Sequence, residues 1–275
     1  MRVAVIGHVE HVTLGRVPAV PVPGGIAHLE GPRSFPGGGG GIAFFQLTRS
    51  PAEVLFYTAF GNDEGANEVR ARVERTGARV FAARRDQPHT RDLVMITPDG
   101  ERTIVVVGDP LHPERTDPLP WDALAGCDAA YFTAQDPAVL QAARAARVLV
   151  VTARRRPALL RSGVRPDVVV GSAFDPREVC RLEDFPLAQR PAALVLTEGE
   201  AGGAVYTAEG ARRFPAPPTR AGGGGAYGAG DSFAGALTYF LGVGVPVLEA
   251  CARAGAHGAA VLGALEPVES QLWIG

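Results

Sequence analysis

Short apolar runs separated by helical or polar segments constrain the fold of this chain more than any other feature. A strand that is buried on both faces of a parallel sheet appears in a sequence as a continuous apolar run. Runs of this kind occupy residues 2–6, 54–60, 129–133, 148–152, 168–171 and 193–197. Their alternation with helical segments predicts an α/β fold, a doubly wound and mostly parallel sheet with helices on both faces.

The expected helices come between and after these runs. Their patterns cover residues 42–49, 64–76, 138–146, 232–241 and 247–262. In an open α/β sheet, ligands bind beyond the carboxyl ends of the strands. We therefore expect the functional residues in the loops that follow the apolar runs.

Two segments break the alternation. Five prolines interrupt residues 12–36, which excludes a helix or a central strand there. Residues 91–107 read as two strands around the turn Pro98-Asp99-Gly100. We expect a single domain over residues 1–275 with a small β lid drawn from about 12–36 and 91–107.

Charge and composition exclude several classes of function. The net charge is −2 and no dense basic run is present, so nucleic acid is not an expected partner. The chain contains no lysine, and its 27 basic residues are all arginine. A P-loop lysine and a lysine Schiff base are therefore excluded, and any bound phosphate must be held by arginine, backbone amides or metal.

Cysteine usage and hydropathy predict the compartment. Cys127, Cys180 and Cys251 are far apart and form no CxxC pair, which is typical of buried thiols in a reducing cytoplasm. No apolar stretch reaches the length of a membrane span, and the first residues do not resemble a signal peptide. We expect a cytoplasmic protein without a membrane partner.

The run Gly228-Ala229-Gly230-Asp231 directly precedes an expected helix. Free amides and the helix dipole at such a position can hold an anion, and small residues let a phosphate approach the backbone. Asp231 is placed to accept the proton of an attacking hydroxyl. Spacing alone leaves open a second interpretation, in which Asp231 is only a helix N-cap and the glycines form a tight turn.

This run closely resembles the second signature of the ribokinase-like (PfkB) carbohydrate kinase family. The resemblance implies a three-layer α/β/α fold, ATP and Mg²⁺ as cofactors, and Asp231 as the catalytic base. It also implies that the amides of Gly228, Ala229 and Gly230 form an anion hole for the transferred phosphoryl group.

Further motifs of the family follow in the expected order, at residues 37–41, 61–65, 99–103 and 197–202. The resemblance implies that Gly38 and Gly39 line the substrate site. It places the nucleotide phosphates beside Thr197, Gly199 and Gly202. His257 resembles an adenine-side position, although a packed histidine is an equal alternative.

The chain departs from the family pattern at positions that contact the sugar. The early aspartate falls near Val12, which leaves Glu10 as the nearest polar substitute for a substrate contact. The asparagine of the first signature falls at Ile42, and the first aspartate of the second signature falls at Gly225, with Tyr227 where a threonine is common. The acceptor need not be the usual sugar.

The family's Asn-x-x-Glu, which organises magnesium-bound water, best matches residues 172–175, so Asp175 is the candidate indirect magnesium residue. Next to Glu10, His8 and His11 raise the alternative of a metal site. Alternation along a strand would turn His8 and Glu10 to one side and His11 to the other, which favours a substrate contact for Glu10.

Two other patterns have competing interpretations. The run Arg154-Arg155-Arg156 after a strand could meet phosphate, but we expect a solvated loop. The glycines at 37–41 could suggest a dinucleotide fingerprint, but they do not follow the first strand directly, which disfavours a Rossmann dehydrogenase.

Together these patterns predict an ATP-dependent kinase that phosphorylates a hydroxyl of a sugar or sugar-like molecule. One alternative is a nucleoside or other non-sugar alcohol kinase of the same fold, and another is a non-catalytic ligand-binding or regulatory relative. A homodimer through the exposed lid strands is also expected from the family.

Overall fold

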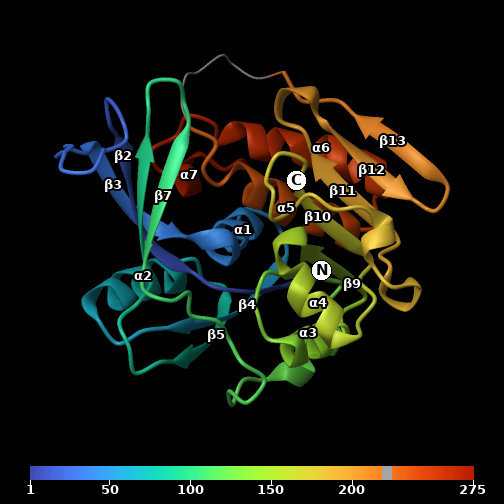
Figure 1. Ribbon diagram of the computed structural model, residues 1–275. Helices are drawn as coiled ribbons and strands as arrows, with labels where there is room; N and C mark the ends of the chain where they lie inside the picture. The colour runs from blue at the N-terminus through green and yellow to red at the C-terminus, as the bar shows by residue number, and fades with distance from the viewer. Residues whose placement is uncertain (219–224) are drawn as a thin grey trace.

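A nine-stranded sheet forms the centre of the protein in the computed structural model, which describes residues 1–218 and 225–275 (Figure 1). The strand order is β13-β12-β11-β10-β9-β8-β1-β4-β5. Neighbours from β11 to β5 pair in parallel, and β12 and β13 add an antiparallel edge. The strands are β1 (Arg2–Ile6), β4 (Glu53–Phe60), β5 (Arg79–Arg84), β8 (Ala129–Phe132), β9 (Val148–Thr152), β10 (Val168–Ser172), β11 (Ala193–Thr197), β12 (Gly203–Thr207) and β13 (Gly210–Phe214).

Helices cover both faces of this sheet and give three layers. The helices are α1 (Gly38–Thr48), α2 (Glu64–Glu74), α3 (Pro137–Ala143), α4 (Arg156–Ser162), α5 (Ala229–Gly242), α6 (Val247–Ala260) and α7 (Pro267–Ser270). On β1, Val3 and Val5 pack into the core under α1, α2, α5 and α6, whereas Ala4 and Ile6 pack into the core under α3 and α4. This alternation along a strand confirms the predicted doubly wound α/β architecture.

A smaller four-stranded sheet lies beside the main one, in the order β3-β2-β6-β7 (Figure 1). Its strands are β2 (Glu10–Arg16), β3 (Glu30–Gly37), β6 (Arg91–Ile96) and β7 (Arg102–Val107). One face buries an apolar cluster with the main body, made of Val12, Leu14, Phe35, Ile42, Val94, Ile96, Tyr227 and Val268. The strands expected within 12–36 and 91–107 build this small sheet.

The glycine run at 37–41 differs from its expected structure. Helix α1 begins at Gly38 rather than at Ile42, so the glycines form its first turn. An added Cβ on Gly40 would lie 2.4 Å from the carbonyl oxygen of His8, and only glycine permits this approach to the end of β1. The first turn of α1 is thereby pressed against the carboxyl end of β1.

Several elements were not predicted from the sequence. Strand β5 and strand β13 are half-buried or exposed strands at the two edges of the main sheet, and both carry arginines, so neither forms a continuous apolar run.

The three cysteines are free and buried. None of the helices within the described residues combines the length and the apolar character that crossing a bilayer requires.

Candidate active site

The carboxyl ends of five parallel strands and the start of α5 meet at one edge of the sheet. His8 follows β1, Thr133 follows β8, Arg154 follows β9, Asp175 follows β10, and Thr197 ends β11. These strands are neighbours in the sheet, and this edge is where open α/β folds bind ligands.

Asp231 lies in the first turn of α5 and is half-buried. The helix N-cap is Gly228, whose φ of 81° lies in the left-handed region that favours glycine. The interpretation of Asp231 as the N-cap is therefore wrong, because Asp231 is the third residue of the helix. Its carboxyl group is free to face the edge where the strands end.

The environment of Asp231 moves the pKa of its carboxyl group towards neutral pH. Burial, with the charge of Glu178, raises the pKa of Asp231 to about 6, and the charges of Arg154 and Arg102 oppose this rise. A carboxylate with a pKa near neutrality can both accept and release a proton at physiological pH. This is the property required of a general base.

The backbone amides next to Asp231 lie at the N-terminal end of α5. The Ala229 N–H donates to the carbonyl of Ala226 at 3.3 Å, and the Ser232 N–H donates to that of Gly228 at 2.9 Å. Gly230 is exposed, and an added Cβ there would meet no heavy atom within 4 Å. The backbone at Gly230 is therefore accessible to a ligand.

The carboxylates of Glu10 and Asp231 both lie beside the backbone of Gly38 and Gly39. An added Cβ on Gly39 would lie 3.0 Å from Oδ1 of Asp231 and 3.3 Å from Oγ1 of Thr133. Gly38 has a φ of 75°, and its added Cβ would lie 2.9 Å from Oε2 of Glu10. The structure therefore brings together Asp231, Gly38, Gly39 and Glu10.

His8 and His11 point in different directions, as predicted, although His8 lies between β1 and β2 rather than on a strand. His8 Nε2 lies 3.5 Å from Oε1 of Glu10, whereas His11 Nε2 lies 3.0 Å from Oε2 of Glu68. Within residues 1–218 and 225–275, no three His, Cys, Asp or Glu side chains gather as a metal site would require. The metal interpretation of this cluster is not supported by the geometry.

Glu10 and Asp92, on neighbouring strands of the small sheet, form a buried acidic pair. Burial raises the pKa of Glu10 well above its usual value, and the neighbouring Asp92 raises it further. Burial also raises the pKa of Asp92. Two carboxyls in such a place favour sharing a proton over carrying two charges.

The turn after β11 brings the predicted nucleotide residues together. Thr197 Oγ1 donates to the carbonyl of Gly171 at 3.4 Å, and its own carbonyl accepts from the Ala173 N–H at 3.0 Å. Gly199 and Gly202 both have positive φ, and an added Cβ on Gly202 would lie 2.2 Å from a carbonyl oxygen. This turn lies beside the segment that carries Asp175.

His257 has a different environment. It is buried on α6 with its ring centroid 6.0 Å from that of Phe240, and burial lowers its pKa. These contacts are those of a packed histidine, and its place near the adenine stays a prediction.

Arg154 links the acidic residues that follow β10. Its guanidinium lies 2.5 Å from Oδ2 of Asp175 and 2.7 Å from Oε1 of Glu178. The other oxygen of Glu178 accepts from the Ser172 N–H at 2.9 Å. Burial opposes ionisation of Asp175, but the Arg177 amide and Arg154 outweigh it and lower the pKa.

The expectation of a solvated loop at Arg154–Arg156 is wrong. Residues Ala153–Arg155 form a 3₁₀ turn before α4, and all three arginines are only half-exposed. Arg155 Nε donates to the carbonyl of Thr133 at 2.8 Å. The sequence signal for a site was the position of the arginines directly after a parallel strand, at the ligand-binding edge.

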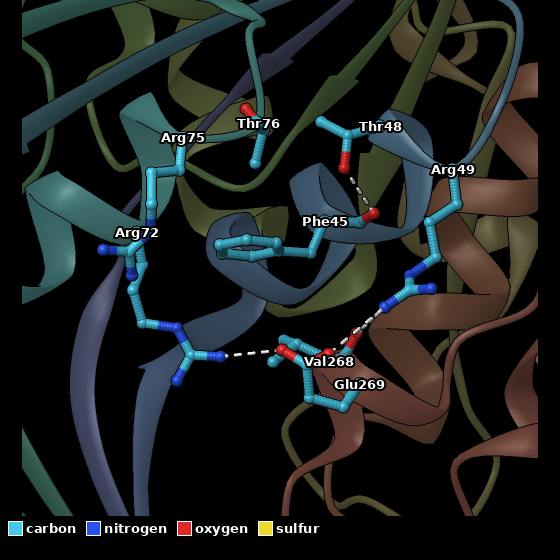
Figure 2. Close-up of a pocket in the computed structure, with 8 residues that line it drawn as sticks. All are labelled: Phe45, Thr48, Arg49, Arg72, Arg75, Thr76, Val268 and Glu269. Atoms are coloured by element: carbon cyan, nitrogen blue, oxygen red, sulfur yellow. Dashed lines mark hydrogen bonds and ion pairs between the residues drawn. The ribbon is translucent and has the colours of Figure 1, made fainter.

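A cavity of about 530 Å³ lies away from these residues, between α1, α2 and α7 (Figure 2). It is lined by Phe45, Thr48, Arg49, Arg72, Arg75, Thr76, Val268 and Glu269. Arg72 pairs with Glu266 at 2.6 Å, and Arg49 donates to the carbonyl of Val268 at 2.7 Å. Two of the three lining arginines are thus engaged, and the cavity lies away from the carboxyl ends of the parallel strands, where open α/β folds bind ligands.

The fold and the residues at its ligand-binding edge define a ribokinase-like α/β protein. The ribokinase of Thermotoga maritima superposes with a TM-score of 0.78 at 18% identity, covering 98% of this chain and 96% of that one. The ribokinase of Giardia lamblia gives a TM-score of 0.81 at 15% identity, covering 98% and 95%. The nucleoside kinase of Burkholderia thailandensis gives 0.76 at 16% identity, covering 98% and 92%.

A family model matches the C-terminal part of the chain. Residues 168–273 match the model of the pfkB family carbohydrate kinases. The resemblance to the ribokinase-like (PfkB) family is therefore confirmed by the sequence of this segment, and the solved structures show that the whole chain has a ribokinase-like fold. No curated protein sequence matches the chain.

Proposed function

We propose that the protein is an ATP-dependent kinase that transfers the γ-phosphoryl group to a hydroxyl of a sugar or sugar-like small molecule, with Asp231 as the general base. The observation that carries this proposal is the position of Asp231. Asp231 is at the start of α5, and its carboxyl group lies beside Gly39 of α1. The pKa of this carboxyl group is about 6. The proposed base thus lies at the N-terminal end of a helix, which favours the binding of an anion.

In the proposed reaction, Asp231 accepts the proton of the acceptor hydroxyl as the oxygen attacks phosphorus. The amides of Gly228, Ala229 and Gly230 would stabilise charge on the transferring group, and the Ala229 N–H would leave the Ala226 carbonyl, 3.3 Å away, to do so. Positioning supplies most of the catalysis in phosphoryl transfer, because the protein performs little covalent chemistry itself.

Magnesium fits the acidic residues after β10 only indirectly. Mg²⁺ keeps several waters and prefers one or two carboxylates together with substrate phosphates. Asp175 and Glu178 offer hard oxygen ligands of this kind, although both are already paired with Arg154. We propose that Asp175 and Glu178 hold Mg²⁺ through water, and the ion would neutralise charge on the ATP phosphates.

The nucleotide side of the proposed site is the turn after β11. Thr197, Gly199 and Gly202 would hold the ATP phosphates, with the positive-φ glycines bringing the backbone close to them. His257 would lie on the adenine side. The chain lacks lysine, so backbone and arginine take the part that a lysine plays in P-loop proteins.

The acceptor side is formed by Glu10, Gly38 and Gly39 beneath the small sheet. We propose that this sheet acts as a lid that excludes water and so limits ATP hydrolysis. Val12 and Ile42, which stand where the family has sugar contacts, are fully buried in the apolar cluster under the lid. Loss of those contacts leaves the acceptor open to other classes.

A nucleoside acceptor is the second candidate. The structure of the Burkholderia thailandensis protein, a nucleoside kinase, contains inosine. A non-catalytic binding protein is a third class, against which the raised pKa of Asp231 argues.

A screen of sugars, polyols and nucleosides with ATP and Mg²⁺ tests the proposal through ADP release. A kinase releases ADP in proportion to one phosphorylated acceptor, identified by ³¹P NMR. Thermal shifts with acceptors but no ADP release with any of them would favour the binding protein.

A further inference from the structure

Arg155 makes no ion pair with a carboxylate of the described residues. Its Nε donates to the carbonyl of Thr133 at 2.8 Å, and its other contact is His112 Nε2, 3.3 Å from a terminal nitrogen. Both partners are uncharged groups. In the part of the chain that the structure describes, no Asp or Glu oxygen lies within 4.0 Å of this guanidinium, whereas Arg154 next to it has two such partners.

A half-buried guanidinium without a counter-ion is unfavourable, because it has lost part of its hydration. Burial, followed by the charge of Arg154, lowers the pKa of Arg155 to about 10. The group still remains charged near neutral pH. Such a charge is best satisfied by an anion that arrives from outside the protein.

Two buried, neutral histidines pack beside Arg155. His112 Nε2 is the atom that faces the guanidinium, and His8 Nε2 accepts from the Gly39 N–H at 3.3 Å. Each proton must therefore lie on Nδ1. The Nδ1 atom of His112 is buried without a hydrogen-bond partner, whereas the backbone of Thr133 interacts with the His8 ring and favours its protonated form. The rings pack edge to face with centroids 4.9 Å apart.

These histidines stay neutral near physiological pH. Burial, with the charges of Arg155 and Arg154, lowers the pKa of His8 to about 3. Burial, the neighbouring His8 and Arg155 also lower the pKa of His112. The cluster thus holds an unpaired cation and the unpartnered Nδ1–H of His112, which is costly unless an acceptor-rich ligand binds.

The cluster belongs to the acceptor side of the proposed site. Thr133, whose carbonyl anchors Arg155, places its Oγ1 beside Gly39 together with Oδ1 of Asp231. Arg155 lies close enough to Glu10 for an ionised Glu10 to raise its pKa, whereas Arg154 is directed to Asp175 and Glu178. The two consecutive arginines therefore serve different halves of the site.

We propose that Arg155, His112 and His8 form a subsite for an anionic group on the phosphoryl acceptor, a carboxylate or a phosphate monoester. The acceptor is then a sugar acid or a sugar phosphate, and a neutral sugar leaves the subsite unfilled. This inference rests on the proposed function, since it names the substrate class of the same site. The acidic pair Glu10 and Asp92 does not oppose an anion when its carboxyls are protonated, as their raised pKa values favour.

Matched pentose compounds test the subsite without any catalysis. Binding of ribose, ribonate and ribose 5-phosphate to the full chain would be measured by calorimetry in the absence of ATP. A charge-assisted contact to arginine predicts about 10- to 100-fold tighter binding of an anion than of ribose. Ribonate and ribose 5-phosphate separate the carboxylate from the phosphate monoester. Ribose binding as tightly as both anions would overturn the subsite.

Variants then assign the effect to Arg155. Arg155→Gln should remove the preference for the anion and leave ribose binding nearly unchanged, while Arg155→Lys should retain part of it. Arg161→Gln removes an equal charge from the exposed end of α4 and should keep the full preference. A preference that survives in Arg155→Gln, or that is lost equally in Arg161→Gln, would contradict the assignment.

The same compounds distinguish the two levels of the proposal. ADP release with ATP and Mg²⁺ tests the kinase, whereas the calorimetry tests only the subsite. Anion-selective binding without ADP release from these compounds or from any acceptor of the screen would refute the kinase and support the subsite. Phosphorylation of ribose in preference to both anions would support the kinase and refute the subsite.

Discussion

Oδ1 of Asp231 lies 3.0 Å from the position that a Cβ on Gly39 would occupy. The proposed base is thus packed against the first turn of α1, in a space that only glycine leaves free. We predict that Gly39→Ala displaces the carboxyl group and lowers kcat/KM by about 10- to 100-fold, since small displacements of catalytic groups have effects of this size. Steady-state kinetics of ADP release measure this effect.

Gly77→Ala is the matched control for this prediction. Gly77 follows α2 with a φ of 75°, and an added Cβ would contact nothing within 4 Å. This variant should lose about 1 kcal/mol of stability through backbone strain and keep its kcat/KM. An equal loss of activity in both variants would show that Gly39 acts through stability alone.

The protonation of Asp231 predicts the pH dependence of catalysis. A base with a pKa of about 6 must lose its proton to act, so kcat/KM should rise through a midpoint near pH 6 and level off above it. The charge of Glu178 raises this pKa. Glu178→Gln should therefore move the midpoint to lower pH, whatever it does to the plateau.

Glu183→Gln provides the comparison, because Glu183 is an exposed carboxylate on the same segment of chain. Its pH profile should match that of the unmodified protein. A midpoint that stays fixed or moves upward in Glu178→Gln would contradict the electrostatic account of Asp231.

The raised pKa of Asp231 also has a cost in stability. The folded protein holds this proton more tightly than an ordinary carboxyl with a pKa of 3.8, so the cost is absent below about pH 4, grows as pH rises to about 6 and is complete above it. Asp231→Asn removes it. We predict up to about 3 kcal/mol of added stability near neutral pH and little change near pH 4, measured by urea unfolding. Equal stability of the two proteins at both pH values would argue against the raised pKa.

Much of the fold was predictable because its signals are local. The continuous apolar runs of β1 and β9 correspond to strands buried on both faces. Strands β5 and β13 were not predicted, because an edge strand with arginines shows no continuous apolar run. The start of α1 was misplaced because glycine disfavours helices, and the close packing against His8 that requires it is a tertiary contact.

The site was predictable only in part, for a similar reason. The sequence around Asp231 contains the motif itself, and strand alternation was enough to separate Glu10 from His11. The burial of Arg154 depends on Asp175 and Glu178, which are more than 20 residues away in sequence. A run of arginines looks solvated until such distant partners are known.

The outer strand of the small sheet supports a prediction about assembly. Strand β7 lies at the edge and exposes Ile104, Val105, Val106 and Val107, with 40–55% of each residue accessible. An apolar edge strand of this kind favours pairing with another copy. We predict a dimer by light scattering and a monomer for Val106→Arg. A monomer at micromolar concentration for the unmodified protein would contradict pairing through this strand.

Turnover by Asp231→Asn tests the central claim most directly. The substitution keeps the shape of the side chain and removes its ability to take a proton. With the acceptor found in the ADP-release screen, we predict a loss of kcat of at least about 100-fold, since general-base catalysis contributes 10²–10⁴-fold. ATP binding by calorimetry should change little. Near-wild-type turnover in Asp231→Asn would contradict the assignment of Asp231 as the base.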